Sequence, residues 1–216
     1  ARYVYAKVKH YEQEIARNQS TYWLVFELLW RDYFRWVARK FGRLIFSLGG
    51  IQQNTSLKYS RSQKLFESWR LGNTGIPFID ANMRELLLTG FMSNRGRQNV
   101  ASFLCKDLQV DWTWGAMWFE SALIDYDVCS NWGNWNYVAG VGNDPRENRY
   151  FNILTQAKRY DYEGAYVKHW LPELEQIPAK KVHNLSELSP QEQKKYALIL
   201  GKDYPKPLVR FEKRVS

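Results

Sequence analysis

Apolar side chains recur every three to four residues over most of the chain, and stretches that alternate apolar and polar residues are nearly absent. An α-helix repeats every 3.6 residues and a strand every two, so this pattern predicts an all-α protein. The longest periodic stretch follows a candidate N-cap at Ser20 or Thr21 and ends at Gly42, after a basic last turn. Small polar residues favour the start of a helix and glycine its end, which predicts one long helix over residues 20–42.

Five further helices are predicted from the same signals, over residues 80–90, 96–108, 111–124, 161–171 and 189–201. The last of them carries the most complete set of boundary residues. Ser189 is a candidate N-cap, Pro190 occupies the first helical position, and Glu192 would complete a capping box. Gly201 then ends the pattern.

The segments between these helices are polar and rich in glycine and asparagine, and we interpret three of them as loops: residues 47–63, 72–80 and 130–149. Ligand contacts often concentrate in loops that a rigid scaffold supports. With 216 residues the chain is long enough for one sizeable domain. We therefore predict a helical domain over residues 1–200, followed by a basic tail over residues 201–216 that runs extended across the surface.

Composition adds a formal net charge of +9 and an aromatic share of 16%, with ten tryptophans. Positive charge attracts phosphate, and exposed aromatic rings offer stacking surfaces for unpaired bases or flat cofactors. These features indicate a nucleic acid or a nucleotide as partner. The alternative, with equal weight at this point, is that the aromatic residues form an ordinary core and the basic residues a solvated surface.

Two further compositional features concern the membrane and the redox compartment. The sequence has no run of about 18 apolar residues, so we expect no membrane insertion. Its two cysteines, Cys105 and Cys129, are too few for a disulfide framework. A reducing, intracellular compartment is therefore the expectation.

The common catalytic signatures are missing from the sequence. His10, His169 and His183 are scattered without the spacing of metal ligands, so neither a metal site nor a histidine-based triad is predicted. There is no P-loop, and Gly140 with Gly142 falls short of a dinucleotide fingerprint because no predicted strand precedes them. Hydrolase and kinase functions are thereby disfavoured.

Polar residues on otherwise apolar helices are the remaining candidates for chemistry. The long first helix presents an acid, an indole and a guanidinium on one face, at the spacing i, i+3, i+4: Glu27, Trp30 and Arg31. Asp125 and Asp127 are predicted to end the helix over residues 111–124, where a carboxylate opposes the helix dipole and needs a cation.

Arg97 is the candidate partner of Asp125, because it belongs to a basic and amide-rich helix start at residues 94–98. Free backbone N–H groups at such a start favour an anion. A purely structural salt bridge between two helices would also account for Arg97 and Asp125. Such a salt bridge would account less well for the asparagines and tryptophans beside them.

Several longer motifs occur in a fixed order: ELLWRDYF at 27–34, SNRGRQN at 93–99, KDLQVDW at 106–112 and DYDVCSNWGNWNY at 125–137. In these motifs the sequence resembles the flavin-binding helical domain of the photolyase and cryptochrome family. Among the branches of that family it is most similar to the DASH cryptochromes, and the resemblance extends over about residues 2–177. It implies an all-α domain that holds FAD and carries out light-driven electron transfer.

The resemblance implies six residues that hold the FAD: Arg31, Asn94, Arg97, Asp125, Asp127 and Asn131. Asn131 takes the position that faces the flavin N5, where an amide tunes the cofactor through a hydrogen bond. The resemblance also implies a catalytic route that brings electrons from the surface through Trp112 and Trp135. The third aromatic position of this route matches Tyr59, where a tryptophan is usual in the family.

A set of DNA-contacting residues is implied in the same way: Glu27, Trp30, Arg35, Gln98, Tyr137 and Gln156. Gln98 and Tyr137 are typical of DASH members rather than of photolyases that repair duplex DNA. They favour bases flipped out of single strands and stacked on Trp30 and Tyr137. Single-stranded or lesion-containing DNA is the expected partner, with blue-light-driven repair or photoreception as the function.

Two segments that precede this region in the family, an antenna domain and a segment that wraps the flavin diphosphate, are absent from the sequence. It is therefore expected to be either a fragment of a longer protein or a shortened, flavin-free relative. Such a relative would serve as a nucleic-acid-binding or structural subunit, with RNA or a larger protein assembly as partner. A third hypothesis is that the tryptophan-rich segments merely pack. The resemblance further implies a plastid or a mitochondrion as the compartment.

Overall fold

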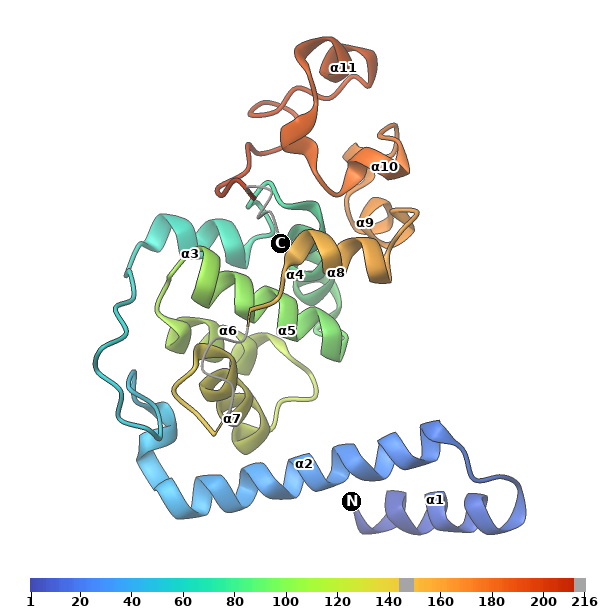
Figure 1. The fold of residues 1–216 in the computed structure, drawn as a ribbon, viewed down its shortest axis with the longest axis vertical. Coiled ribbons are helices and arrows are strands. Elements are labelled where there is room, and N and C mark those ends of the chain that lie inside the picture. Colours follow the sequence, from blue (N-terminus) through green and yellow to red (C-terminus); the bar gives the residue numbers. More distant parts are fainter. Residues whose placement is uncertain (144–149, 212–216) are drawn as a thin grey trace.

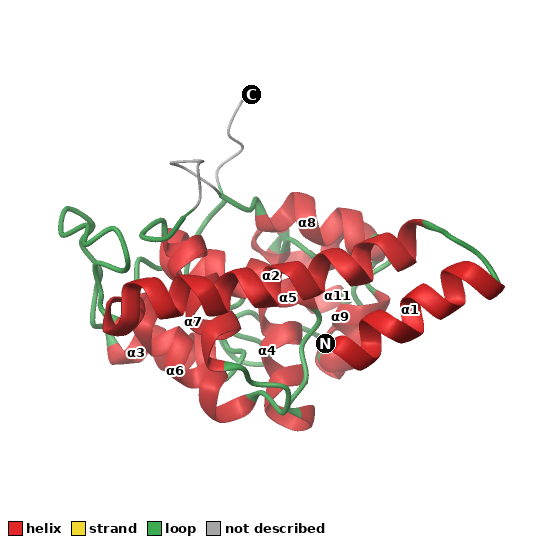
Figure 2. Cartoon of the chain, turned by 90° about the horizontal axis from the view of Figure 1, so that it is seen from below, coloured by secondary structure: helices red, strands yellow, loops and turns green. Residues whose placement is uncertain are grey.

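The computed structural model describes residues 1–143 and 150–211. Within these residues every regular element is a helix, which confirms the all-α prediction (Figure 2). The first two helices, α1 (Arg2–Glu14) and α2 (Gln19–Phe41), run side by side along one edge of the molecule (Figure 1). Among the described helices, none combines the length and the apolar character that crossing a bilayer requires.

The other α-helices follow in chain order: α3 (Gln63–Arg70), α4 (Pro77–Thr89), α5 (Asn94–Ser102), α6 (Trp112–Ala122), α7 (Val128–Ala139), α8 (Ile153–Tyr160), α9 (Ala165–Trp170), α10 (Ala179–Val182) and α11 (Pro190–Lys195). Short 3-10 turns lie between some of them, at Gly42–Phe46, Pro172–Leu174 and Leu185–Glu187. A π-helical turn, Phe103–Asp107, continues α5. The helices predicted over 20–42, 80–90, 96–108 and 111–124 therefore exist, with shifted ends.

The core runs through α3, α4, α5, α6 and α7 and continues into α8, α9, α10 and the segment that carries Tyr204. Its largest fully buried side chains include Trp69, Trp112, Phe103, Met83 and Ile79. Each such side chain contributes about 1.5 to 3 kcal/mol through burial. Many of the tryptophans are thus core residues, as the alternative reading of the composition proposed.

The helix starts show which polar residues act as caps. The cap of α2 is Asn18, not Ser20 or Thr21, because the Asn18 side chain accepts the backbone N–H of Thr21 at 3.1 Å. The Thr21 hydroxyl accepts the backbone N–H of Asn18 in return. This reciprocal pair satisfies two otherwise free donors, so the helix begins earlier than predicted. The capping box predicted for Ser189 and Glu192 is present.

Asp80 was expected near the start of α4, but the helix begins three residues earlier, at Pro77. The Asp80 carboxylate is fully buried and accepts N–H groups from Thr74 and Gly75, which closes the preceding turn over the helix. It also accepts the hydroxyl of Tyr204. Burial raises the pKa of Asp80, and these hydrogen bonds oppose the rise.

Tyr204 lies in the segment predicted to be an extended surface tail, and that description is wrong for it. Its side chain is buried, and the N–H of Leu208 donates to Thr74 O at 2.9 Å. An aromatic residue that fills space over the start of α4 holds the segment in place. The division at residue 200 itself stays a prediction.

The prediction of a loop over residues 130–149 is wrong for its first part, because α7 occupies Val128–Ala139. Residues 144–149 lie outside the described chain. Neither Asp125 nor Asp127 ends α6, which stops at Ala122. Asp127 instead caps α7, where a carboxylate suits the helix dipole. The buried residues Trp132, Trp135 and Val138 recur at helical spacing and bury this helix despite its asparagines and glycine.

Two other helices are shorter than predicted. The one predicted over 189–201 ends at Lys195, and Ala197 adopts a positive φ of 51°, which a helix cannot continue. The one predicted over 161–171 begins at Ala165, because the Asp161 carboxylate accepts the N–H groups of Tyr166 and Val167 and so serves the helix from outside.

The approach of α2 to α7 requires a glycine. A Cβ atom at Gly133 would lie 2.2 Å from Cδ1 of the buried Phe34. At an exposed helix position, replacing glycine by alanine would stabilise the helix by about 1 kcal/mol. At Gly133 we expect the substitution to destabilise the protein, because overpacking against Phe34 typically costs about 1 to 3 kcal/mol. Urea unfolding of the variant checks the sign against Ser121→Ala, an exposed control, and a Gly133→Ala protein at least as stable as wild type would contradict this packing.

The hydrogen bond between Tyr204 and Asp80 should matter for stability. Tyr204→Phe leaves a buried carboxylate with one donor fewer, which should lower the free energy of unfolding by about 1 to 3 kcal/mol. Tyr162→Phe removes a hydroxyl from a side chain that is 65% exposed, so it serves as the matched control. Equal midpoints for the two variants in urea would show that the carboxylate does not depend on Tyr204.

Candidate functional site

A cavity lies between α5, α6, α7 and the segment that joins α6 to α7. Its polar lining includes Asn94, Arg97, Gln98, Asp125, Asp127, Ser130, Asn131 and Asn134. Its apolar lining includes Ala101, Phe119, Leu123, Trp135 and Val138. An apolar wall with a few convergent polar groups is the usual composition of a small-molecule site.

One face of α7 supplies much of this lining. Residues 127, 130, 131, 134, 135 and 138 follow the spacing i, i+3, i+4, i+7, i+8, i+11, so they lie on one side of the helix. Ser130, Asn134 and Val138 were not predicted as site residues. Their helical spacing could have identified them, but it was not considered because the segment was predicted to be a loop.

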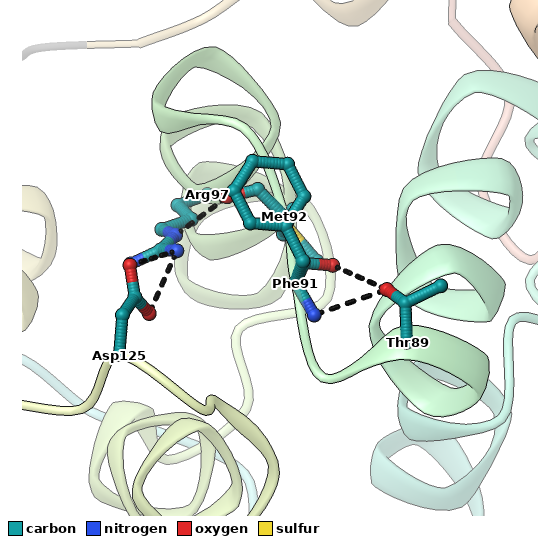
Figure 3. Close-up of polar contacts among 5 residues, drawn as sticks. All are labelled: Thr89, Phe91, Met92, Arg97 and Asp125. Carbon is teal, nitrogen blue, oxygen red and sulfur yellow. Dashed lines mark hydrogen bonds and ion pairs between the residues drawn. The ribbon is translucent and has the colours of Figure 1, made fainter.

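Arg97 and Asp125 form the predicted ion pair, as Figure 3 shows. The Arg97 Nη2 donates to both oxygens of Asp125, at 3.0 and 2.9 Å, and its Nε donates to Met92 O at 2.8 Å. The backbone ahead of Met92 is held by Thr89, whose hydroxyl accepts the N–H of Phe91 at 3.1 Å. The guanidinium is therefore oriented from two sides.

This pair positions groups more than it stabilises the fold. The Asp125 side chain is 53% exposed and that of Arg97 27% exposed. Exposed ion pairs contribute about 0 to 1 kcal/mol. Both side chains line the cavity, so the pair sets the charge and the shape of its rim.

Asp127 combines a cap with two nearby cations. Its carboxylate accepts the N–H of Ser130 at 2.9 Å and lies 3.7 Å from the Arg35 guanidinium of α2. Burial alone would raise the pKa of Asp127, but the hydrogen bonds from Ser130 and the charges of Arg35 and Arg31 outweigh it and lower the pKa. Asp127 thus carries a negative charge at the cavity rim at neutral pH.

Asn131 lines the cavity from the second turn of α7. Its Nδ2 donates to the backbone oxygen of Ala116 in α6 at 3.0 Å. With the amino group tied to α6, the amide oxygen is the part of this side chain that remains to accept a donor from a bound ligand.

Arg31 is the one predicted cofactor residue outside the cavity lining. Its Nη1 lies 3.4 Å from Asp32 on the same helix, at the surface of α2. It is nevertheless close enough to Asp127 to lower the pKa of that carboxyl. Its influence on the cavity is therefore electrostatic.

The three aromatic residues of the predicted electron route are placed as follows. Trp135 and Trp112 are buried, and Tyr59 is half-buried. The Trp135 ring lies against Gly115, where a Cβ would be 2.3 Å from its Cη2, one helical turn after Trp112. The Tyr59 hydroxyl donates to Ala139 O at 3.1 Å, and burial raises its pKa well above the ordinary value.

The residues predicted to contact DNA are spread over four helices. The ring of Trp30 meets that of Tyr137 edge to face, with centroids 6.4 Å apart. Gln98 lines the cavity, and its Oε1 accepts Arg95 Nη1 at 2.7 Å. Glu27 and Arg35 are exposed on α2, whereas Gln156 is half-buried on α8. The structure thus brings Trp30 and Tyr137 together, with Gln98 at the cavity.

A search for metal-binding side chains covered the residues that the structure describes. Within residues 1–143 and 150–211, no group of three or more histidine, cysteine or acidic side chains is arranged to hold a metal ion.

Comparison with known proteins gives a consistent result. Residues 23–216 match the family described as the FAD binding domain of DNA photolyase. A Cryptochrome DASH from Synechocystis is 60% identical over 215 residues, which is 100% of this chain and 44% of that protein. A rice protein named "Cryptochrome DASH, chloroplastic/mitochondrial" is 60% identical over 180 residues, 83% of this chain and 31% of that protein.

Among solved structures, that of the Synechocystis cryptochrome superposes with a TM-score of 0.94 at 61% identity. The match covers 97% of this chain and 43% of that one. The chain therefore spans less than half the length of the relatives named here.

The cap at Asp127 generates a test of the site's local stability. Asp127→Ala should lower the free energy of unfolding at neutral pH by about 1 kcal/mol, because α7 loses its N-cap. A carboxyl whose folded pKa is lowered contributes stability above its unfolded pKa of about 3.9, and this is lost as the pH falls through the folded pKa. Urea unfolding from neutral to acidic pH should thus show the two proteins converging below about pH 4.

Asp127→Asn is the control, because asparagine is an equally good N-cap without the charge. It should retain most of the stability that Asp127→Ala loses. If the difference in the free energy of unfolding between wild type and Asp127→Ala grew toward acidic pH, the lowered pKa of Asp127 would be contradicted.

Proposed function

Since the chain belongs to the family of the FAD-binding domain of DNA photolyase, we propose that it holds FAD within a longer, DASH-type protein that carries out light-driven electron transfer. One observation carries this proposal. Of the six residues predicted to hold FAD, five line the same cavity: Asn94, Arg97, Asp125, Asp127 and Asn131. These residues come from α5, α7 and the segment that joins α6 to α7, and their convergence supports a ligand site over mere packing.

The chemistry of the cavity lining fits a flavin. A flat, largely apolar ring system needs apolar walls, which Phe119, Leu123 and Trp135 provide. Its polar edge needs amides and charged groups of both signs, which Asn131, Arg97 and the aspartates provide. Bound FAD would supply light absorption and one-electron chemistry, and the protein would supply binding and orientation.

Each polar residue has a distinct task in this proposal. Asn131, anchored to α6 through its amino group, would accept a hydrogen bond from a ring N–H with its amide oxygen. Arg97, held by Met92 and Asp125, would present its guanidinium to the polar edge of the ring. The buried wall around Trp135 would exclude water from the ring face.

The proposed substrate is a base flipped out of a single strand. The paired rings of Trp30 and Tyr137 offer a stacking surface, and the net charge of +9 favours the phosphate backbone. Photoreception would use the same electron-transfer step without DNA. The convergence of the flavin residues favours both of these over a flavin-free structural subunit. A plastid or mitochondrial location is proposed only by analogy with the name of the rice relative.

The test uses the full-length protein that contains this domain. We expect it to purify with flavin absorbance, and Asn131→Ala should weaken FAD binding by roughly two- to tenfold, since one hydrogen bond contributes about 0.5 to 1.5 kcal/mol. Asn73→Ala, at an exposed asparagine outside the cavity lining, is the matched control. Fluorescence titration of the flavin-stripped protein measures both affinities. A full-length protein that takes up no FAD, or equal affinities for the two variants, would overturn the proposal.

A further inference from the structure

Trp132 lies on α7 one turn before Trp135 and is not part of the predicted electron route. Its ring meets that of Trp112 with centroids 5.9 Å apart and that of Phe46 at 5.0 Å. Its indole N–H donates to Glu120 Oε2 at 3.0 Å. Trp132 is 5% exposed, whereas Glu120 is exposed on α6. Trp132 thus contacts the buried Trp112 with its ring and donates its N–H to a carboxylate that faces solvent.

The partner of each aromatic N–H or O–H decides what happens when that group loses an electron. An oxidised indole or phenol is a far stronger acid than its neutral form, and transfer of its proton to a base keeps the electron vacancy at that site. The Trp112 N–H donates to the backbone oxygen of Leu48 at 3.0 Å, and the Tyr59 hydroxyl donates to that of Ala139. A backbone carbonyl does not accept a proton at neutral pH.

Trp132 differs from both, because a carboxylate accepts its N–H. Trp112 is therefore suited to pass an electron on, and Trp132 is suited to be the last donor. The neighbouring Tyr126 does not compete as a base, since burial, followed by the effect of Glu120, raises its pKa to about 12 and keeps it protonated.

We propose that Trp132, with Glu120 as its proton acceptor, is the terminal electron donor of the aromatic route, in place of Tyr59. This inference rests on the proposed function, because the group bound in the cavity must first take an electron through Trp135 and leave Trp112 oxidised. One electron then moves from Trp132 to Trp112, and the indole proton moves to Glu120. Trp112 is restored, Trp132 becomes a neutral radical and Glu120 a neutral carboxylic acid. An external thiol then gives a hydrogen atom to Trp132 and becomes a thiyl radical, and Glu120 releases its proton to water.

The test compares Trp132→Phe, Tyr59→Phe and Glu120→Gln in the full-length, FAD-loaded protein. FAD content and thermal midpoint in the dark are measured first for each variant. A wild-type protein without FAD would defeat the proposed function and is recognised before any light is applied. Samples frozen under illumination are then examined by electron paramagnetic resonance, and infrared difference spectra follow the protonation of carboxylates.

We expect wild type to show a neutral tryptophan radical together with a new protonated-carboxyl band, and Trp132→Phe to lose both. Glu120→Gln preserves a hydrogen-bond acceptor on an exposed side chain, so it should fold normally, lose the infrared band and form the neutral radical at least about 100-fold more slowly. Glu163→Gln, at an exposed glutamate on the loop before α9, is its matched control. A tyrosyl radical in wild type, or a radical lost in Tyr59→Phe and retained in Trp132→Phe, would overturn the inference. So would a Glu120→Gln protein that behaves like Glu163→Gln.

Discussion

The burial of one face of α7 against α2 and α6 is the constraint on which the candidate site depends. Trp132 packs on Trp112 of α6 and on Phe46, and Gly133 lets Phe34 of α2 approach closely. A helix with a buried face has a fixed rotation about its axis, because any turn would expose large indoles to water. The polar positions of α7 are thereby aimed into the cavity without needing strong interactions of their own.

Polar interactions around the cavity orient groups rather than hold the fold together. Arg97 with Asp125 and Arg35 with Asp127 are partly exposed pairs, and such pairs add little stability. Each nevertheless gives a charged side chain one defined direction. The apolar core supplies the free energy and the ion pairs supply the geometry, so a change at the rim should alter binding more than folding. Asp80 is fully buried, and its hydrogen bonds do hold the fold together, since they close a turn and anchor Tyr204.

What could be predicted from the sequence follows from the range of the interactions involved. The long helix α2 and the capping box of α11 at Ser189 and Glu192 depend on neighbours within a few residues, so their patterns are readable. The contact of Tyr204 with Asp80 joins positions 124 residues apart, and no local pattern announces it. Helix α7 was missed because asparagine and glycine suggest a loop, although its tryptophans and Val138 keep a helical period. The candidate cavity residues came from the order of whole motifs, which carries spatial information that periodicity lacks.

The tryptophans explain why composition alone left two interpretations open. Trp23 and Trp36 are more than half exposed on α2, whereas Trp69, Trp112, Trp132 and Trp135 are buried. The buried indoles are core residues, and one of them, Trp135, also lines the cavity, so packing and chemistry are not alternatives here. What separates one buried indole from another is the atom that accepts its N–H. Trp69 donates to the backbone oxygen of Val100, as Trp112 does to that of Leu48, and both bonds only satisfy a buried donor. A carboxylate at the same position, as beside Trp132, adds a place for the proton to go, and this changes what a core residue can do without changing how it packs.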